Sequence, residues 1–192
     1  RCAGDDIVKA VIEAHVIPAL TRFLQDQDIP RARDHVVARL GAIRSGETAL
    51  QGIRRQQFAQ QVLTPFAHWL LEAHEDTDRF SDDVTLTAAW DAVFRNGQPP
   101  SAEVLEFIQP DGNDTPVDLT ALRVEVAADQ LTHTVARIME PFIDCLSEAT
   151  YYYDCDFMLL AGRPSRFPAL RRMIAQRMPV SPEKIVTMHL SL

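Results

Sequence analysis

The sequence has few cysteines and no closely spaced cysteine pair. The three that it contains are odd in number and form no Cys-X-X-Cys motif: Cys2, Cys145 and Cys155. A disulfide framework needs paired cysteines, and a structural zinc site needs closely spaced ones. The sequence therefore argues against both classes and favours a reducing compartment. We expect Cys145 and Cys155 to be free, buried thiols, the alternative being that the two meet.

Long apolar runs and an excess of positive charge are also missing. No stretch approaches the roughly 18 to 20 consecutive apolar residues that a membrane span requires. The 27 acidic residues outnumber the 19 basic ones and give a net charge of -8. Because nucleic acids and anionic membranes attract basic surfaces, we expect neither as a partner.

The sequence shows no secretory signal pattern and does not begin with methionine. It opens directly in an apparent helix. We therefore expect the chain to be a piece of a longer protein.

No group of side chains has the spacing of a metal site or of a nucleophile with its base. Five of the six histidines are scattered over separate segments: His15, His35, His68, His74 and His133. His68 and His74 are near neighbours, but their spacing does not place both on one helical face. We expect no metal site and no catalytic residue within this chain.

Apolar residues at helical spacing are abundant, and 46% of the residues are hydrophobic. They predict long amphipathic helices over residues 5–24, 51–71 and 127–148, and shorter helices over 86–94 and 101–108. Pro18 and Pro65 should bend or break the first two helices, because proline removes a backbone donor and crowds the carbonyl four residues back. Alternation at period two predicts one strand over residues 122–126.

The end of the chain reads as strand, glycine turn, helix and strand. The stretch 156–161, which is apolar after Asp156, predicts a buried strand. Residues 168–176 predict a helix, and residues 185–188 a final strand. Two strands joined through a helix require a parallel sheet. The sequence therefore predicts a helix-rich α/β fold.

The turn Gly162-Arg163-Pro164-Ser165-Arg166 is the candidate ligand site. Gly162 can adopt backbone angles closed to other residues, and Ser165 or Arg166 is expected where the next helix begins with free N–H groups. The alternative is an ordinary strand-to-helix turn in which Ser165 serves only as a helix cap.

This turn, together with the apolar residues before it, resembles the adenosine motif of actin- and DnaK-type ATPases. More narrowly, it resembles the Gly-Arg-Pro-Ser-Arg turn of SrfB-type virulence factors. Further stretches agree with that family in the same order: residues 4–8 with 16–20, residues 54–58 through Thr64-Pro65, and residues 182–189.

The resemblance implies the second lobe of an actin-like, ribonuclease H-like ATPase. Residues 1–192 would form one fragment of the protein. Residues 1–30 and 117–192 would be the α/β core of the lobe, and residues 31–116 a mostly helical insertion.

The resemblance also implies a set of nucleotide-binding residues. Residues Gly162 to Arg166 would pack against adenine and ribose, a helix starting at Arg54 and Arg55 would approach the base from the other side, and Gly4 and Asp5 would follow the phosphate loop. Each set also has a purely structural alternative. Arg54 and Arg55 would lie at a solvated helix start, where basic residues oppose the helix dipole, and Gly4-Asp5-Asp6 would form an N-cap.

The resemblance implies that the chain is the nucleotide-binding half of an ATPase. The full-length protein would bind ATP or ADP with magnesium and would lie in the bacterial cytoplasm. The first lobe and its phosphate loop are not among these residues, so the fragment alone should bind no cofactor and hydrolyse nothing. The remaining lobe would be its partner, and the helical insertion is a candidate surface for another protein. The alternative is a non-catalytic helical interaction module that keeps the fold without the chemistry.

Overall fold

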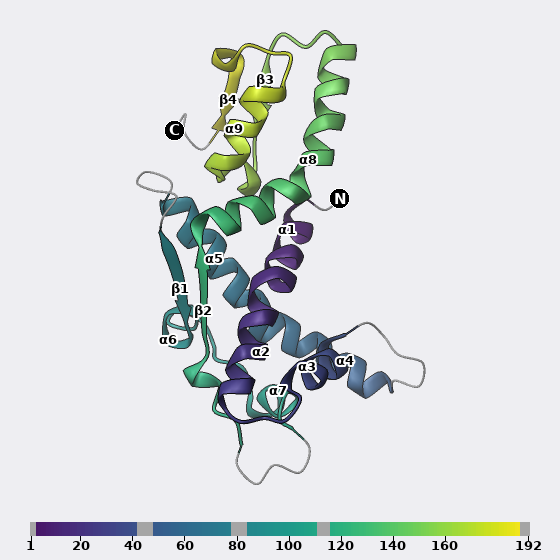
Figure 1. Ribbon diagram of the computed structural model, residues 1–192. Coiled ribbons are helices and arrows are strands. Elements are labelled where there is room, and N and C mark those ends of the chain that lie inside the picture. Colours follow the sequence, from purple (N-terminus) through teal and green to yellow (C-terminus); the bar gives the residue numbers. More distant parts are fainter. Residues whose placement is uncertain (1–2, 42–47, 78–83, 111–115, 189–192) are drawn as a thin grey trace. The chain divides into compact units, whose positions relative to one another are not determined.

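The computed structural model describes residues 3–41, 48–77, 84–110 and 116–188, with only the backbone given for Ala3, Asp76, Thr77, Arg163 and Pro164 (Figure 1). The chain divides into two compact units. The terminal unit comprises Arg1–Val11, Glu72–Val84 and Ala127–Leu192, and the middle unit comprises Ile12–Leu71 and Thr85–Val126. The described part is a helix-rich α/β structure. Which residues form a core and which an insertion stays a prediction.

The first two long helices contain their prolines without ending at them. Helix α1 (Ala3–Val11) continues through a π-helical segment, Ile12–Val16, into α2 (Ile17–Asp26). Helix α4 (Ala49–Phe58) continues through a second π-helical segment, Ala59–Leu63, into α5 (Thr64–Thr77). Pro18 and Pro65 lie just after these segments, at the start of α2 and α5. The wider π turn moves away the carbonyl that each proline ring would crowd, so the bend or break predicted for each helix appears as a bulge.

Aromatic side chains contact one another in the largely aliphatic core of the middle unit and at its margin. Phe66 lies 6.1 Å from the ring of Trp90 and 6.0 Å from that of Phe94, measured between ring centroids. Phe58 and Phe107 are 5.7 Å apart in the same way. The other helices of this unit are α3 (Ala32–Leu40), α6 (Trp90–Val93), α7 (Ala102–Glu106) and the 3-10 turn Leu119–Ala121. Such aromatic pairs add to the burial energy that holds these short elements together.

The helix predicted over residues 86–94 is wrong for its first half. Residues Thr85–Ala89 form strand β1, which pairs with β2 (Arg123–Ala127), and only Trp90–Val93 is helical. Leu86 and Ala88 are buried while Thr85 and Thr87 are exposed, so the pattern has period two. The strand predicted over residues 122–126 is confirmed as β2. Pairing with it selects the period of two of a strand over the period of 3.6 of a helix for residues 85–89. The two strands run in opposite directions (Figure 1).

Helix α8 (Ala128–Tyr152) is the longest element of the terminal unit, and both α1 and α9 (Pro168–Arg177) pack against it. It contains Pro141, and Figure 1 shows it changing direction along its length. A proline inside a helix is an ordinary cause of such a bend. The helix ends at Tyr152 rather than at the predicted residue 148, and Tyr151 is an exposed part of its last turn.

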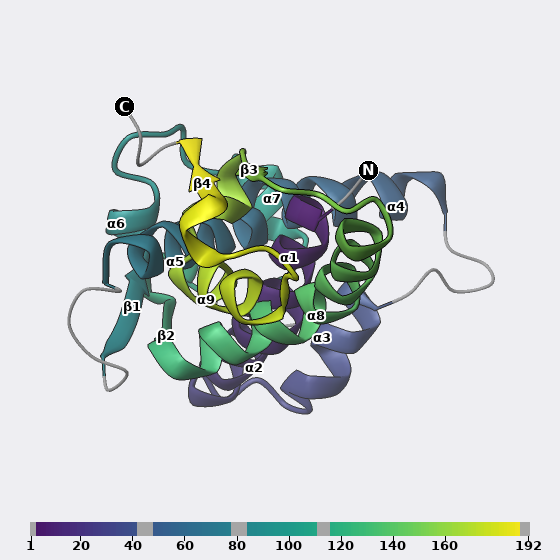
Figure 2. The same ribbon diagram turned by 90° about the horizontal axis from the view of Figure 1, so that it is seen from above.

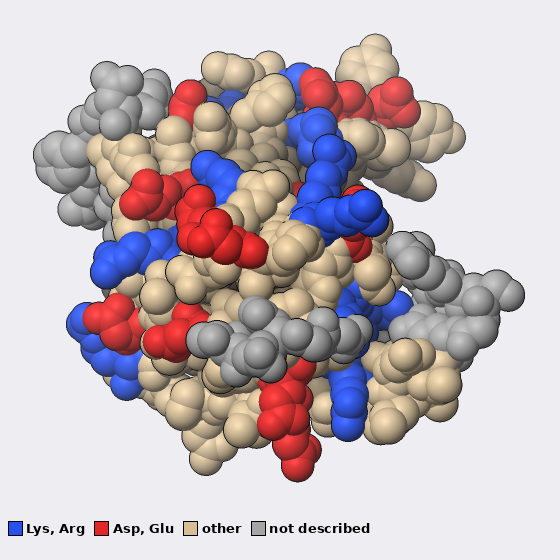
Figure 3. Space-filling view, turned by 60° about the horizontal axis from the view of Figure 1, so that its bottom comes forward, with Lys and Arg blue, Asp and Glu red and all other residues tan. Residues whose placement is uncertain are grey.

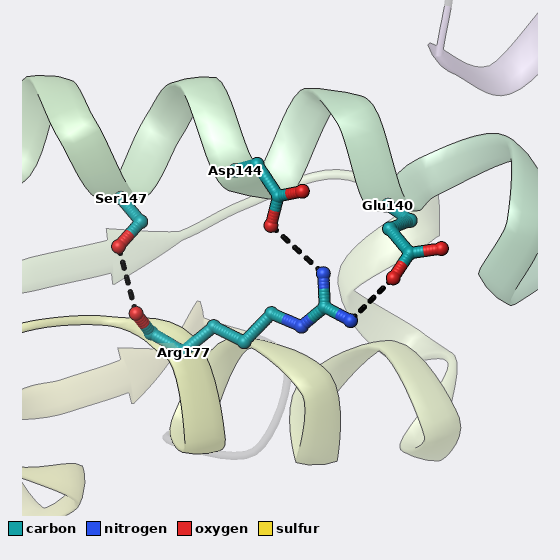
Figure 4. Close-up of polar contacts among 4 residues, drawn as sticks. All are labelled: Glu140, Asp144, Ser147 and Arg177. Atoms are coloured by element: carbon teal, nitrogen blue, oxygen red, sulfur yellow. Dashed lines mark hydrogen bonds and ion pairs between the residues drawn. The ribbon is translucent and has the colours of Figure 1, made fainter.

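Polar contacts fix the end of α9 against α8. The guanidinium of Arg177 donates to Asp144 Oδ1 at 2.8 Å and to Glu140 Oε1, and Ser147 Oγ donates to the carbonyl oxygen of Arg177 at 2.7 Å (Figure 4). The hydrogen bonds to Glu140 and then Asp144 raise the pKa of Arg177 above its usual value. Because exposed ion pairs contribute little stability, these contacts chiefly set the register of the two helices.

Strands β3 (Met158–Leu160) and β4 (Ile185–Thr187) form the predicted parallel pair, with α9 between them in sequence and the 3-10 turn Pro182–Lys184 before β4. Met158 pairs with Ile185, and Leu160 pairs with Thr187. Helix α9 lies beside this pair in both views (Figures 1 and 2). The topology predicted for the end of the chain is therefore confirmed.

The prediction that the first of these strands is buried is wrong. Leu159 is 56% exposed and Phe157, just before the strand, is 57% exposed. Both lie on one face of the pair, because alternate residues of a strand point the same way. The apolar run had suggested burial on both faces, which is the rule for parallel strands covered on each side.

Candidate functional site

Gly162 forms the turn between β3 and α9 in a conformation that favours glycine, with φ of 90°. Its carbonyl oxygen accepts two hydrogen bonds from Ser165, one from the backbone N–H at 3.2 Å and one from Oγ at 2.7 Å. Ser165 is 5% exposed, so its hydroxyl is turned into the structure. The serine therefore locks the turn that the glycine makes possible.

The helix after this turn begins at Pro168, where the range 168–176 had predicted it, and not at Ser165 or Arg166. Residues Arg163–Arg166 form a 3-10 turn, and α9 starts at Pro168 with Phe167 as its N-cap residue and no side-chain cap. Proline at the first helical position sets this start, because it fixes its own φ and holds the preceding residue extended. Ser165 and Arg166 are thus not at the start of α9. Arg166 is exposed, and the side chains of Arg163 and Pro164 lie outside the described part of the chain.

A buried histidine supports the turn from within the terminal unit. The ring of His74, on α5, stacks on Phe167 with centroids 5.3 Å apart and planes 19° apart. Its Nε2 lies 2.8 Å from Thr132 Oγ1 on α8, and the residue is 4% exposed. One ring thereby ties α5 and α8 to the residue that joins the 3-10 turn to α9. His74 follows Ala67, Leu70 and Leu71 at helical spacing, and this pattern could have assigned it to the core.

Gly4 and Asp5 belong to the same unit as the Gly162 turn. Helix α1 begins at Ala3, so Asp5 and Asp6 lie inside its first turn, where a negative charge favours the helix dipole, and not at the predicted N-cap. Helix α1 contacts the 3-10 turn Arg163–Arg166 as well as α8. The structure thus brings the segment that carries Gly4 and Asp5 against the candidate site.

Arg54 and Arg55 belong to the middle unit and not to the terminal one. Helix α4 begins at Ala49, where Thr48 and Gln51 form a capping box, so the predicted helix start at the two arginines is wrong. Both arginines lie inside α4, where the positive end of the helix dipole does not oppose their charge. Arg55 Nη1 donates to the carbonyl oxygen of Gly41 at 3.3 Å, and Arg54 is exposed. That either one contacts a nucleotide stays a prediction.

Other features of the described residues bear on function. No three His, Cys, Asp or Glu side chains among them are placed to hold a metal ion. None of the helices in the described ranges has the length and apolar character needed to cross a membrane. Acidic and basic side chains are interspersed on the face drawn in Figure 3.

The free thiols of Cys145 and Cys155 are exposed, which corrects the prediction that they are buried. Cys145 lies on the outer side of α8, and Cys155 follows its C-terminus. Cys2 lies outside the described residues.

Comparison with known proteins gives one match. No curated protein matches the chain, and no solved structure does. A family model described as Virulence factor SrfB matches residues 1–190. That range contains the Gly162 turn, α1 and both arginines of α4. Because the match spans nearly the whole sequence, the chain belongs to the SrfB virulence factor family.

Proposed function

We propose that this SrfB-family chain is the nucleotide-binding half of an actin-like ATPase. It would form the second lobe of a ribonuclease H-like fold, with residues 31–116 as a helical insertion, and bind ATP or ADP with magnesium in the full-length protein. The observation that carries the proposal is Gly162 at φ of 90°, two residues after the end of the parallel strand β3. In open α/β sheets, ligands bind outside the carboxyl ends of parallel strands.

The geometry of the turn supports contact between its main chain and a ligand. Gly162 is exposed and has no Cβ, so a base or ribose can approach its backbone closely. The exposed guanidinium of Arg166 is free to stack on a base or to pair with a phosphate. Ser165 would act by holding the turn, since its hydroxyl already donates to the Gly162 carbonyl.

The chain is proposed to act with the remaining lobe of the same protein. Phosphoryl transfer depends on positioned carboxylates, magnesium and a phosphate loop, and the family's set of these groups is not found within residues 1–192. The exposed apolar face of the β3–β4 pair supports this, because parallel sheets are ordinarily covered on both faces. Phe157 and Leu159 supply that face, and Met188, the residue after β4, is also exposed. We place the protein in the bacterial cytoplasm as part of the same proposal.

Titration of the full-length protein with ATP and magnesium, followed calorimetrically, tests the proposal. Gly162→Val puts a β-branched side chain where φ is positive, and Ser165→Arg forces a large cation into a buried site, so both should weaken ATP binding at least about tenfold. Arg166→Glu alters an exposed side chain and should weaken binding without disturbing the fold. Gly97→Val is the matched control, because nothing lies within 4 Å of a Cβ at Gly97.

Unchanged affinity in the Gly162 and Ser165 variants would overturn the adenosine-site assignment. A full-length protein that binds no ATP at all would favour the non-catalytic interaction module. Circular dichroism of each variant separates loss of binding from loss of folding.

A further inference from the structure

A cavity of about 290 Å³, open to solvent, lies at the surface of the middle unit, between α2 and the segment that contains β2. Helix α2 lines it with Ala19, Arg22, Phe23 and Asp26, which follow one another at spacings of three, one and three residues. That spacing places all four on one face of the helix. The helix therefore presents an apolar floor, made by Ala19 and Phe23, with a cation and an anion at its edge.

The opposite wall has the same chemical character. Ala121, Arg123 and Glu125 line it, and alternation along β2 points the latter two side chains away from the core. Val124 and Val126 are buried on the other face of the strand. The cavity thus has one cation and one anion on each wall, with apolar surface between them.

These four charged groups are not paired within the described part of the protein. Arg22, Asp26, Arg123 and Glu125 all line the cavity, yet no hydrogen bond or ion pair of their side chains occurs among the described residues. Arg22 and Asp26 are four residues apart on one helix, where such pairs commonly form. Two guanidinium groups and two carboxylates are therefore available to a ligand, and their charges sum to zero.

We propose that this cavity binds a zwitterion of about dipeptide size. A ligand carboxylate would pair with Arg22 and Arg123, because guanidinium groups bind carboxylates in a bidentate manner. A ligand ammonium would pair with Asp26 and Glu125, and an apolar side chain would lie on Phe23. The volume is at the small end of the range for ligand sites, which fits such a molecule.

The balance of charge distinguishes this site from the nucleotide site. The lining of the cavity is electrically neutral, so it offers no net attraction to a polyphosphate. It also belongs to the middle unit, whereas the Gly162 turn belongs to the terminal unit. The proposal therefore does not depend on ATP binding, and either proposal can fail alone.

Titration of the isotope-labelled 192-residue chain with glycyl-L-leucine, followed by heteronuclear NMR, tests the assignment. We expect saturable shifts confined to residues 19–26 and 121–125, with a dissociation constant in the millimolar range or tighter. N-acetyl-glycyl-L-leucine keeps only the carboxylate, and glycyl-L-leucinamide keeps only the ammonium. Each should bind at least about tenfold more weakly, because each leaves two charged groups of the cavity without a partner.

Variants identify the groups responsible. Arg22→Ala and Arg123→Ala should each weaken glycyl-L-leucine binding about tenfold, and Glu125→Gln should weaken it without changing the carboxylate-only compound. Arg33→Ala is the matched control, an exposed arginine of α3 in the same unit that does not line the cavity. The proposal is overturned by the absence of saturable shifts, by shifts that survive Arg22→Ala and Arg123→Ala, or by equal binding of the capped compounds. Dispersed spectra of each variant establish that it is folded.

Discussion

Replacing Gly162 with alanine should destabilise the terminal unit, whereas the same replacement at Gly4 should stabilise it. At Gly162 the backbone φ of 90° is strained for any residue with a Cβ. The strain cannot relax by a local flip, because both the N–H and the hydroxyl of Ser165 hold the Gly162 carbonyl. The full cost, about 1 to 3 kcal/mol, should therefore appear as lost stability.

Gly4 gives the opposite expectation from the same chemical change. It lies in α1, and nothing lies within 4 Å of a Cβ built there. Alanine in a helix loses less backbone entropy on folding than glycine, so Gly4→Ala should add about 0.5 kcal/mol. The pair thus separates a conformational requirement from a general preference for glycine.

Thermal and urea unfolding followed by far-UV circular dichroism measure both changes. In a chain of this size, about 1 kcal/mol shifts the unfolding temperature by about 2 to 4 °C, so Gly162→Ala should lower it by several degrees. Hydrogen exchange of residues 158–177 should show the loss of protection at the turn itself. A Gly162→Ala protein as stable as the wild type, or changes of the same sign at both glycines, would refute the account of the turn.

Three other changes have definite expected outcomes. Phe167→Leu keeps an apolar side chain but removes the ring stacked on His74, and should lower the stability measured by urea unfolding by about 1 to 2 kcal/mol. A double-mutant cycle with His74→Leu should give a coupling energy of about 1 kcal/mol between the two side chains. A coupling energy of zero would refute the stack. Burial lowers the pKa of His15 below its usual value of 6.5, so the folded state binds fewer protons than the unfolded state and stability should fall as the pH drops below 6.5. In unfolding measured from pH 7.5 to 5, His15→Gln should therefore flatten the dependence of stability on pH. An unchanged dependence would contradict this prediction. Thr48→Ala removes the capping hydrogen bond to Gln51 and should cost about 1 kcal/mol, whereas Thr48→Ser should cost little.

The parts of the fold that follow from local pattern could be predicted from the sequence. The apolar face of α8, the alternation in β2 and the strand, turn, helix and strand at the end of the chain all depend on residues close in sequence. The positions of Pro18 and Pro65 correctly located the two helix irregularities. Whether each irregularity is a π bulge or a break was not predictable in the same way. Either one accommodates a proline inside a helix, and only packing selects between them.

Two features that depend on residues far apart in sequence were either predicted wrongly or not predicted at all. Leu86, Ala89, Trp90 and Val93 fit a helical spacing as well as a strand, and pairing with β2 decided for the strand over the first half. The stack of His74 on Phe167 joins residues 93 positions apart in the numbering of the chain and has no local signature.

The candidate site was predictable in outline only. The glycine turn at residue 162 followed from its place after an apolar run. The inward hydrogen bond of Ser165 and the 3-10 turn Arg163–Arg166 before α9 did not, because they depend on the fit of that turn to the unit beneath it.

Photoaffinity labelling of the full-length protein with 8-azido-ATP locates the adenine pocket, because the azide is carried on the base itself. We expect the labelled peptide to contain Gly162 to Arg166 and excess ATP with magnesium to abolish the labelling. Labelling confined to peptides outside that turn, or labelling that ATP does not compete, would contradict this expectation.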